Sequence, residues 1–305
     1  MSYPYLSDAL KALTGLDIPL PLPTFGLCVV GAMLVATVFF RRELQRLRLA
    51  GELRPVKPRP RDDSPLPVED KRGLDEFVST FACAVLISGV LGARIFHIFE
   101  HLPQFLADPW PMIFSRSGLS IMGGLIVGTF AGIWVVWRSG LPLRPVLDAA
   151  APTMMIGYGL GRIGCQISGD GDWGTVANMA LKPDWLPTWL WAQTYDNNIY
   201  GVVIPAPGVY PAPIYETTMA LLLFGLLWAV RRHPFSKGWL FAVYLLLAGA
   251  ERLLIEQIRV NPVLEFIGVR ATQAEMISGV FIVLGLAGIA LLSRRSPPAG
   301  KPVPA

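Results

Sequence analysis

The sequence predicts an all-α polytopic membrane protein with about seven transmembrane helices and a small external head between the fourth and fifth. Hydrophobic residues make up 53% of its 305 residues, and the mean hydropathy is +0.49. They gather into seven runs, each close to the roughly 20 residues that a helix needs to cross a bilayer. Charged residues make up 16% of the chain and lie mostly between these runs.

The runs define the expected elements in order. The predicted spans lie at about 23–40, 76–98, 119–138, 146–168, 213–230, 238–258 and 272–293. The first ends at Arg41-Arg42. Spans one to four occupy 23–168, the head 169–212, and spans five to seven 213–293.

The segments outside the spans are also interpreted. Residues 1–22 should hold a short interfacial helix, because Leu6, Leu10 and Leu13 share one helical face. The loop at 41–75 is basic and rich in proline, and we expect it to be largely irregular. The tail at 294–305 should be disordered.

Positive charge sets the expected orientation. With the N-terminus outside, the four inside segments hold 18 of the 26 Lys and Arg residues. This places the head and the N-terminus on the outer side and the C-terminus in the cytoplasm. The net charge of +4 does not indicate a nucleic-acid partner, because the basic residues alternate between the two sides.

The head is rich in aromatic residues. They are Trp173, Trp185, Trp189, Trp191, Tyr195, Tyr200 and Tyr210. Such residues beside a membrane are typical of an interfacial belt. The alternative is a folded external head that covers a cleft.

The fourth predicted span ends in the stretch from Gly157 to Gly169, which places Arg162 among glycines that include Gly161 and Gly164. An arginine at the end of a span can simply extend to the interface. Glycines, however, allow a ligand or the backbone to come close. We therefore expect an anion site, with a lipid phosphate as the anion.

The outer end of the second span carries Arg94, His97 and His101 on one helical face. They form a candidate site, although interfacial polar residues facing water would look the same. A histidine pair also permits a metal site, but we saw no cysteine or further carboxylate at ligand spacing.

The third predicted span begins with Gly123-Gly124, and Gly124, Gly128 and Gly132 follow at intervals of four. Small residues at this spacing indicate close helix packing. The outer glycine pair would also let a ligand approach the backbone.

Two further spans carry intramembrane charge. Span five opens with Tyr215-Glu216, and span six ends with Arg252, Glu256 and Arg259 at helical spacing. Arg252–Glu256 and Glu256–Arg259 are expected to pair along one helix, which by itself would be a neutralised polar stripe. However, Arg94, Arg162, Glu216, Arg252 and Glu256 fall at one depth, so we expect these five charges to line one cavity with an excess of positive charge.

These motifs resemble the prolipoprotein diacylglyceryl transferase family over nearly the whole chain. The most specific piece is Gly161-Arg162-Ile163-Gly164, followed by a glycine-rich turn to Gly174. The supporting pieces are Gly92-Ala93-Arg94, Gly118-Leu119-Ser120 with Gly123-Gly124-Leu125, Tyr215-Glu216, and Arg252 through Arg259.

The resemblance implies a multi-pass enzyme of the bacterial inner membrane with a periplasmic head. It would transfer the diacylglyceryl group of phosphatidylglycerol to the lipobox cysteine thiol of a prolipoprotein signal peptide, releasing glycerol phosphate. Its partners would be these two substrates and membrane lipid, and no cofactor or metal is expected. Arg162 and Arg252 match functional arginines of the family and are assigned to the phosphate. The other predicted substrate-binding residues are Arg94, Gly123, Gly124, Gly161, Gly164, Gly174, Tyr215, Glu216 and Glu256.

The chain departs from the family pattern at two informative positions. The family usually has a histidine before the Gly-Gly pair, where this chain has Met122, and a tyrosine where it has His97. A thioether cannot accept a proton, so we expect His97 to act as the catalytic proton acceptor. The alternative is a divergent paralogue that binds phospholipid but has another acceptor or no catalysis. A transporter would more often show two similar halves, and we see no internal repeat.

Overall fold

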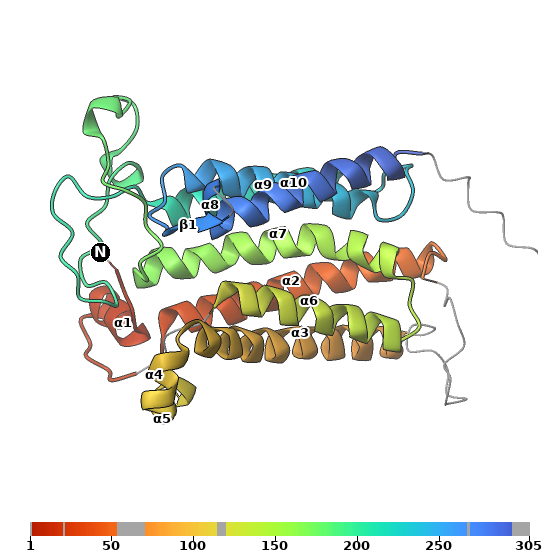
Figure 1. Cartoon of the computed structure of the whole chain (residues 1–305), viewed down its shortest axis with the longest axis horizontal. Coiled ribbons are helices and arrows are strands. Elements are labelled where there is room, and N and C mark those ends of the chain that lie inside the picture. Colours follow the sequence, from red (N-terminus) through yellow and green to blue (C-terminus); the bar gives the residue numbers. More distant parts are fainter. Residues whose placement is uncertain (1, 21, 54–70, 115–119, 267–268, 295–305) are drawn as a thin grey trace, which may run out of the picture. The chain divides into compact units, whose positions relative to one another are not determined.

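The computed structural model describes residues 2–20, 22–53, 71–114, 120–266 and 269–294, and it is mainly helical (Figure 1). Each predicted span contains a helix. The seven are α2 (Thr24–Leu49), α3 (Lys71–Glu100), α6 (Ile121–Arg138), α7 (Leu143–Ser168), α8 (Ala212–Val230), α9 (Trp239–Glu256) and α10 (Gln273–Leu292). By length and composition, α2, α3, α8 and α10 can each cross a membrane, and α6 is a shorter apolar helix. The protein is therefore an all-α membrane protein, apart from one short hairpin described below.

The chain forms two compact units, which we describe separately. One unit contains Thr37–Ala149, and the other combines Met1–Ala36 with Ala150–Ala305.

In the Thr37–Ala149 unit, α3 packs along α6. Glycines permit the contact, because a Cβ on Gly92 would lie 2.6 Å from the carbonyl oxygen of Gly123. The predicted external loop after α3 contains two short helices that were not expected, α4 (Leu102–Ala107) and α5 (Pro109–Phe114).

The prediction that residues 41–75 form an irregular loop was wrong at both ends. Helix α2 continues past Arg41-Arg42 to Leu49, and α3 already begins at Lys71. Residues 41–49 consist of good helix formers, and the side chains of Leu44 and Leu47 are buried. The two helices are joined there by Arg41, whose Nε and Nη2 lie 2.5 and 2.7 Å from the carboxylate oxygens of Asp75. The middle of the loop, 54–70, lies outside the described residues, as does the tail from 295.

The larger unit is built on α7, α8, α9 and α10. Its core contains Ala151 and Met155 from α7, Ala220 and Leu227 from α8, and Leu240 and Tyr244 from α9. Helices α9 and α10 lie side by side, and a Cβ on Gly249 would come within 2.8 Å of the Ser278 carbonyl oxygen. The expected N-terminal helix is present as α1 (Leu6–Thr14), and Gly15 ends it in the left-handed conformation.

Residues 169–211 contain no long helix. They contain the 3₁₀ turns η1 (Met179–Leu181) and η2 (Thr188–Leu190), and Val209 forms bridges with both Val176 and Gln193. The Tyr195 side chain is buried and its hydroxyl donates to Gln166 at 2.8 Å, whereas Trp185 is 81% exposed. Some aromatic residues therefore hold this segment together, and others remain available for an interface.

A short hairpin precedes α10 and was not predicted. Strand β1 (Val263–Phe266) pairs antiparallel with β2 (Val269–Thr272). It returns the chain so that Thr272 caps α10, where its hydroxyl accepts from the Glu275 amide at 3.1 Å.

Candidate functional site

The glycines of α7 serve mainly to pack the helix. A Cβ on Gly159 would lie 2.9 Å from the Ala220 side chain, and one on Gly164 would lie 2.9 Å from Cys28. Only Gly161, next to Arg162, has open space where a side chain would stand. The structure thus supports a ligand approach at Gly161 and a packing role at Gly164.

Arg162 is held by two carboxylates and an aromatic ring. Its Nε lies 2.9 Å from Oε2 of Glu216, and its Nη1 contacts the carboxylate of Asp172. The guanidinium carbon lies 5.1 Å from the ring centroid of Tyr158, one turn earlier on α7. The side chain is 13% exposed, so it is largely buried while remaining reachable.

Glu216 is the centre of the network. Its side chain is fully buried, and its Oε1 accepts from Nη1 of Arg252 at 3.1 Å. Nη1 of Arg259 lies 3.9 Å from its other oxygen. Three arginines from α7, α9 and the segment after α9 therefore surround one carboxylate that α8 places among them.

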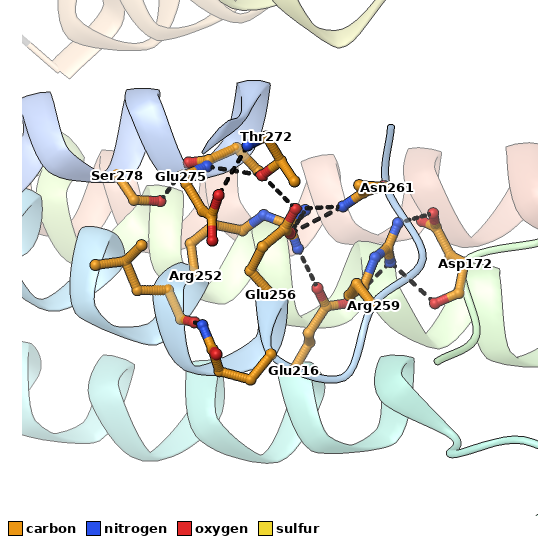
Figure 2. A network of polar contacts seen from close by, with 12 residues as sticks. Asp172, Glu216, Arg252, Glu256, Arg259, Asn261, Thr272, Glu275 and Ser278 are labelled. Atoms are coloured by element: carbon orange, nitrogen blue, oxygen red, sulfur yellow. Dashed lines mark hydrogen bonds and ion pairs between the residues drawn. The ribbon is translucent and has the colours of Figure 1, made fainter. Parts of the chain in front are cut away.

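A second carboxylate, Glu256, orients Arg252 (Figure 2). Its Oε2 lies 2.8 Å from Nη2 of Arg252, as the helical spacing predicted. The Glu256 carboxylate also accepts hydrogen bonds from the Asn261 amide, at 2.8 Å to each oxygen, and from the Thr272 hydroxyl at 2.6 Å. The hairpin that was not predicted therefore contributes to holding Arg252.

The expected pairing of Glu256 with Arg259 was wrong. Helix α9 ends at Glu256, and beyond it Arg259 turns to Asp172, with Nη2 2.5 Å from Oδ1 and Nη1 2.9 Å from the carbonyl oxygen. A bridge between Gly174 and Arg259 fixes this approach, and a Cβ on Gly174 would lie 2.7 Å from the Ile258 carbonyl oxygen. Gly174 is thus a packing glycine that brings the loop after α7 against the end of α9.

The charge balance differs from the prediction. Arg162, Arg252 and Arg259 meet Asp172, Glu216 and Glu256, so the described contacts match three cations with three carboxylates. The expected excess counted Arg94, Arg162 and Arg252 against two glutamates, and it included neither Arg259 nor Asp172. Burial raises the pKa of Asp172, but Arg162 and Arg259 outweigh burial, and its pKa lies below the ordinary value.

Four of the predicted charged residues meet within the larger unit. Glu216, Arg252 and Glu256 join Arg162, whereas Arg94 belongs to the other compact unit and donates to the Met112 carbonyl oxygen at 3.2 Å.

The other predicted substrate residues have structural contacts of their own. Gly123 and Gly124 lie in the contact between α3 and α6. Tyr215 stands beside Glu216, and its hydroxyl donates to the Leu190 carbonyl oxygen at 2.6 Å, which ties α8 to the 169–211 segment.

His97 also lies in the smaller unit, at the end of α3. Its ring centroid is 4.4 Å from that of His101, and donor atoms of His97, Glu100 and His101 all lie within 4.8 Å of one another. A carboxylate therefore does stand at ligand spacing, which the sequence interpretation overlooked. This carboxylate is Glu100, whose Oε1 accepts a hydrogen bond from the Ser120 hydroxyl at 2.8 Å.

The sequence interpretation missed three members of the network. Asp172, Asn261 and Thr272 were not singled out, although Asp172 lies in the Gly-Asp-Gly-Asp turn directly before Trp173 and Gly174. Asp172 could have been recognised as a partner for Arg162, because it is a carboxylate in the glycine-rich turn that follows this arginine. Asn261 and Thr272 offered none, because only the hairpin brings them to Glu256.

The fold and the site together define a class: a helical membrane protein with a buried cluster of arginines and carboxylates reachable beside a glycine. Comparison with known families is specific. The prolipoprotein diacylglyceryl transferase family matches residues 12–291, and the chain belongs to this family.

Individual relatives agree. A phosphatidylglycerol–prolipoprotein diacylglyceryl transferase of Symbiobacterium thermophilum is 29% identical over 232 residues, covering 75% of this chain and 82% of that protein. One of Corynebacterium efficiens is 27% identical over 283 residues, covering 88% and 77%. One of Streptococcus pneumoniae is 27% identical over 285 residues, covering 92% and 93%.

Proposed function

We propose that this protein transfers the diacylglyceryl group of phosphatidylglycerol to the cysteine thiol of prolipoproteins and releases glycerol phosphate. It is a transferase of the membrane, as its family membership and its apolar helices indicate. The observation that carries the proposal for the site is the convergence of Arg162 and Arg252 on the two oxygens of one buried carboxylate, Glu216.

This arrangement suits a phosphate leaving group. When the thiolate attacks the glycerol carbon, the carbon–oxygen bond to phosphate breaks and negative charge grows on the phosphate. Fixed guanidinium groups stabilise that charge without having to reorganise. The described contacts of Arg162 use Nε and Nη1, so Nη2 can meet a ligand at the open side of Gly161.

The carboxylates have a positioning role in this proposal. Glu216 and Glu256 hold the arginine forks in fixed orientations, and Asn261 and Thr272 hold Glu256 in turn. Guanidinium groups that are already held in place bind a phosphate with less loss of side-chain entropy than mobile arginines would.

We extend the proposal to topology and partners. All seven long helices cross the inner membrane, the N-terminus and residues 169–211 face the periplasm, and the C-terminus faces the cytoplasm. The bias of Lys and Arg toward the inside segments supports this orientation. The acceptor is the lipobox cysteine of a signal peptide, which would reach the arginines at the membrane surface.

The test is a transfer assay with the purified full chain, phosphatidylglycerol vesicles and a lipobox peptide, in which mass spectrometry follows the gain of a diacylglyceryl group on cysteine. Arg252→Lys keeps the charge but loses the fork, and should lower kcat/KM by about 100-fold or more, corresponding to roughly 3 kcal/mol. The matched control is Arg270→Lys, because Arg270 is 76% exposed on the hairpin. A fully active Arg252→Lys enzyme would contradict the phosphate assignment.

Met122 favours a second candidate, a divergent paralogue that binds phospholipid without transferring its diacylglyceryl group. Met122 stands where the family usually has histidine, and its thioether cannot accept a proton. In that case the purified protein would bind phosphatidylglycerol but leave the peptide unmodified, and Met122→His would create transfer. Transfer by the unaltered protein removes this candidate.

A further inference from the structure

Two buried polar groups beside the arginines are not used by the network. The Glu251 side chain on α9 is buried, and among the described residues its Oε1 has no hydrogen-bond partner. The hydroxyl of Tyr158 on α7 is likewise buried, and no well-formed hydrogen bond is described for it, although it lies within reach of both Glu251 and Arg162. Leaving such groups unpaired costs on the order of 1–3 kcal/mol each, so their presence needs a reason.

Both groups adjoin the proposed phosphate site. Tyr158 lies one turn before Arg162, and its ring faces that guanidinium. Glu251 directly precedes Arg252 in α9. Glu251 interacts electrostatically with charged and titratable groups of α7, α8 and α9, namely Tyr158, Arg162, Glu216, Arg252 and Tyr244.

Glu251 is also a carboxylate beyond those that pair with the three arginines. The three arginines already have three carboxylates, so stability does not require a fourth. A buried carboxylate without a cation of its own is expensive, and such groups are concentrated where they perform chemistry. Glu251 belongs to the same compact unit as Arg162 and Arg252.

We propose that Glu251 is the proton acceptor of the transfer reaction, the role that Met122 cannot fill. This inference rests on the proposed function. The free Oε1 takes the proton from the acceptor thiol, and the sulfur forms a bond to the glycerol carbon of the lipid. The bond between that carbon and the phosphate oxygen breaks, and the electron pair leaves with glycerol phosphate, held by Arg162 and Arg252. Glu251 then returns its proton to the departing phosphate or to water.

Tyr158 is a positioning residue in this scheme. Its ring supports Arg162, and its hydroxyl lies within reach of both Glu251 and Arg162. It can therefore donate to the carboxylate and orient the free oxygen toward the arriving thiol.

The experiment compares Glu251→Gln with the unaltered protein in the same transfer assay. Glutamine keeps the shape but cannot accept a proton, so kcat should fall at least 100-fold, within the range that a general base contributes. KM for phosphatidylglycerol should change by less than threefold. Glu265→Gln, on the exposed hairpin, is the matched control and should be fully active. His97→Ala, measured in parallel, separates the two candidate acceptors, because loss of transfer in that variant together with an active Glu251→Gln variant would assign the role to His97 and overturn the inference.

A peptide carrying selenocysteine separates catalysis from structure, because a selenol is ionised at neutral pH without a base. Glu251→Gln should transfer to the selenol peptide at close to the unaltered rate. Equal losses with thiol and selenol peptides, or no loss with the thiol, would overturn the inference.

A measurement on the unaltered protein covers the case in which Glu251→Gln does not fold. Its thiol rate should fall toward acid pH, whereas its selenol rate should stay flat, and identical profiles would overturn the inference. If the unaltered protein transfers to neither peptide, the proposed function itself fails. If the unaltered protein and the Glu251→Gln variant both transfer the diacylglyceryl group to the thiol peptide, the proposed function stands and only the role of Glu251 is refuted.

Discussion

Replacement of Glu216 by glutamine tests the arginine network most directly. The side chain is fully buried and receives Arg162 at 2.9 Å, Arg252 at 3.1 Å and Arg259 at 3.9 Å. Glutamine preserves the volume but removes the charge, which leaves three largely buried guanidinium groups with two carboxylates. Removing one partner from a buried ion pair costs about 3–5 kcal/mol, and the amide oxygen still accepts one hydrogen bond, so we expect about 3 kcal/mol.

That cost is measurable as thermal unfolding in detergent. At roughly 2–4 °C per kcal/mol for a domain of this size, Glu216→Gln should lower Tm by roughly 6–12 °C. The control is Glu265→Gln, whose side chain is 66% exposed and pairs with Arg270 at 3.8 Å, and it should cost less than about 1 kcal/mol.

A double-mutant cycle sharpens the result. Adding Arg162→Met to Glu216→Gln removes one uncompensated cation, so the double variant should lose less than the sum of the single losses. A Tm for Glu216→Gln within 2 °C of the unaltered protein would refute the view that the arginines depend on this carboxylate.

Three further outcomes are expected. Arg162 and Arg259 hold the pKa of Asp172 below its ordinary value, so its contribution to stability is present above the unfolded pKa of about 3.9 and is lost as pH falls through the lower folded pKa. Asp172→Asn should therefore be destabilising at pH 7, and the difference in Tm should shrink as the pH is lowered below about 3.9. A Tm difference independent of pH would contradict this. Gly123→Ala places a methyl group against the α3 backbone and should cost about 1–3 kcal/mol, whereas Gly128→Ala, with its nearest neighbour at 3.6 Å, should cost clearly less; equal Tm losses would show that α3 and α6 do not pack this closely. Dialysis against a chelator should leave transfer unchanged, and a loss restored by added metal would show that the reaction uses an ion.

The sequence was sufficient for the helices because hydrophobic length is a local property. All seven runs contain a helix, and Arg162, Glu216, Arg252 and Glu256 stood out because charges within apolar runs are costly. The glycines of α7 were recognised as well, but the sequence did not show which of them pack against a neighbouring helix and which leave open space. Whether a glycine admits a ligand, as beside Gly161, or a neighbouring helix, as at Gly164, depends on what packs there.

The tertiary structure decided which charges meet. Asp172 lies in a loop and Arg259 lies past the end of a helix, so their pairing follows from the backbone bridge at Gly174 and not from helical spacing. Thr272 reaches Glu256 only because the β1–β2 hairpin turns the chain back, and strands this short could not be predicted from the hydrophobic pattern. The lack of a cation for Glu251 became visible only when Asp172, Glu216 and Glu256 were matched with the three arginines. Hydrophobic patterning records how each segment meets the bilayer, whereas charge pairing depends on distances between segments far apart in the chain, and only the folded structure fixes those distances.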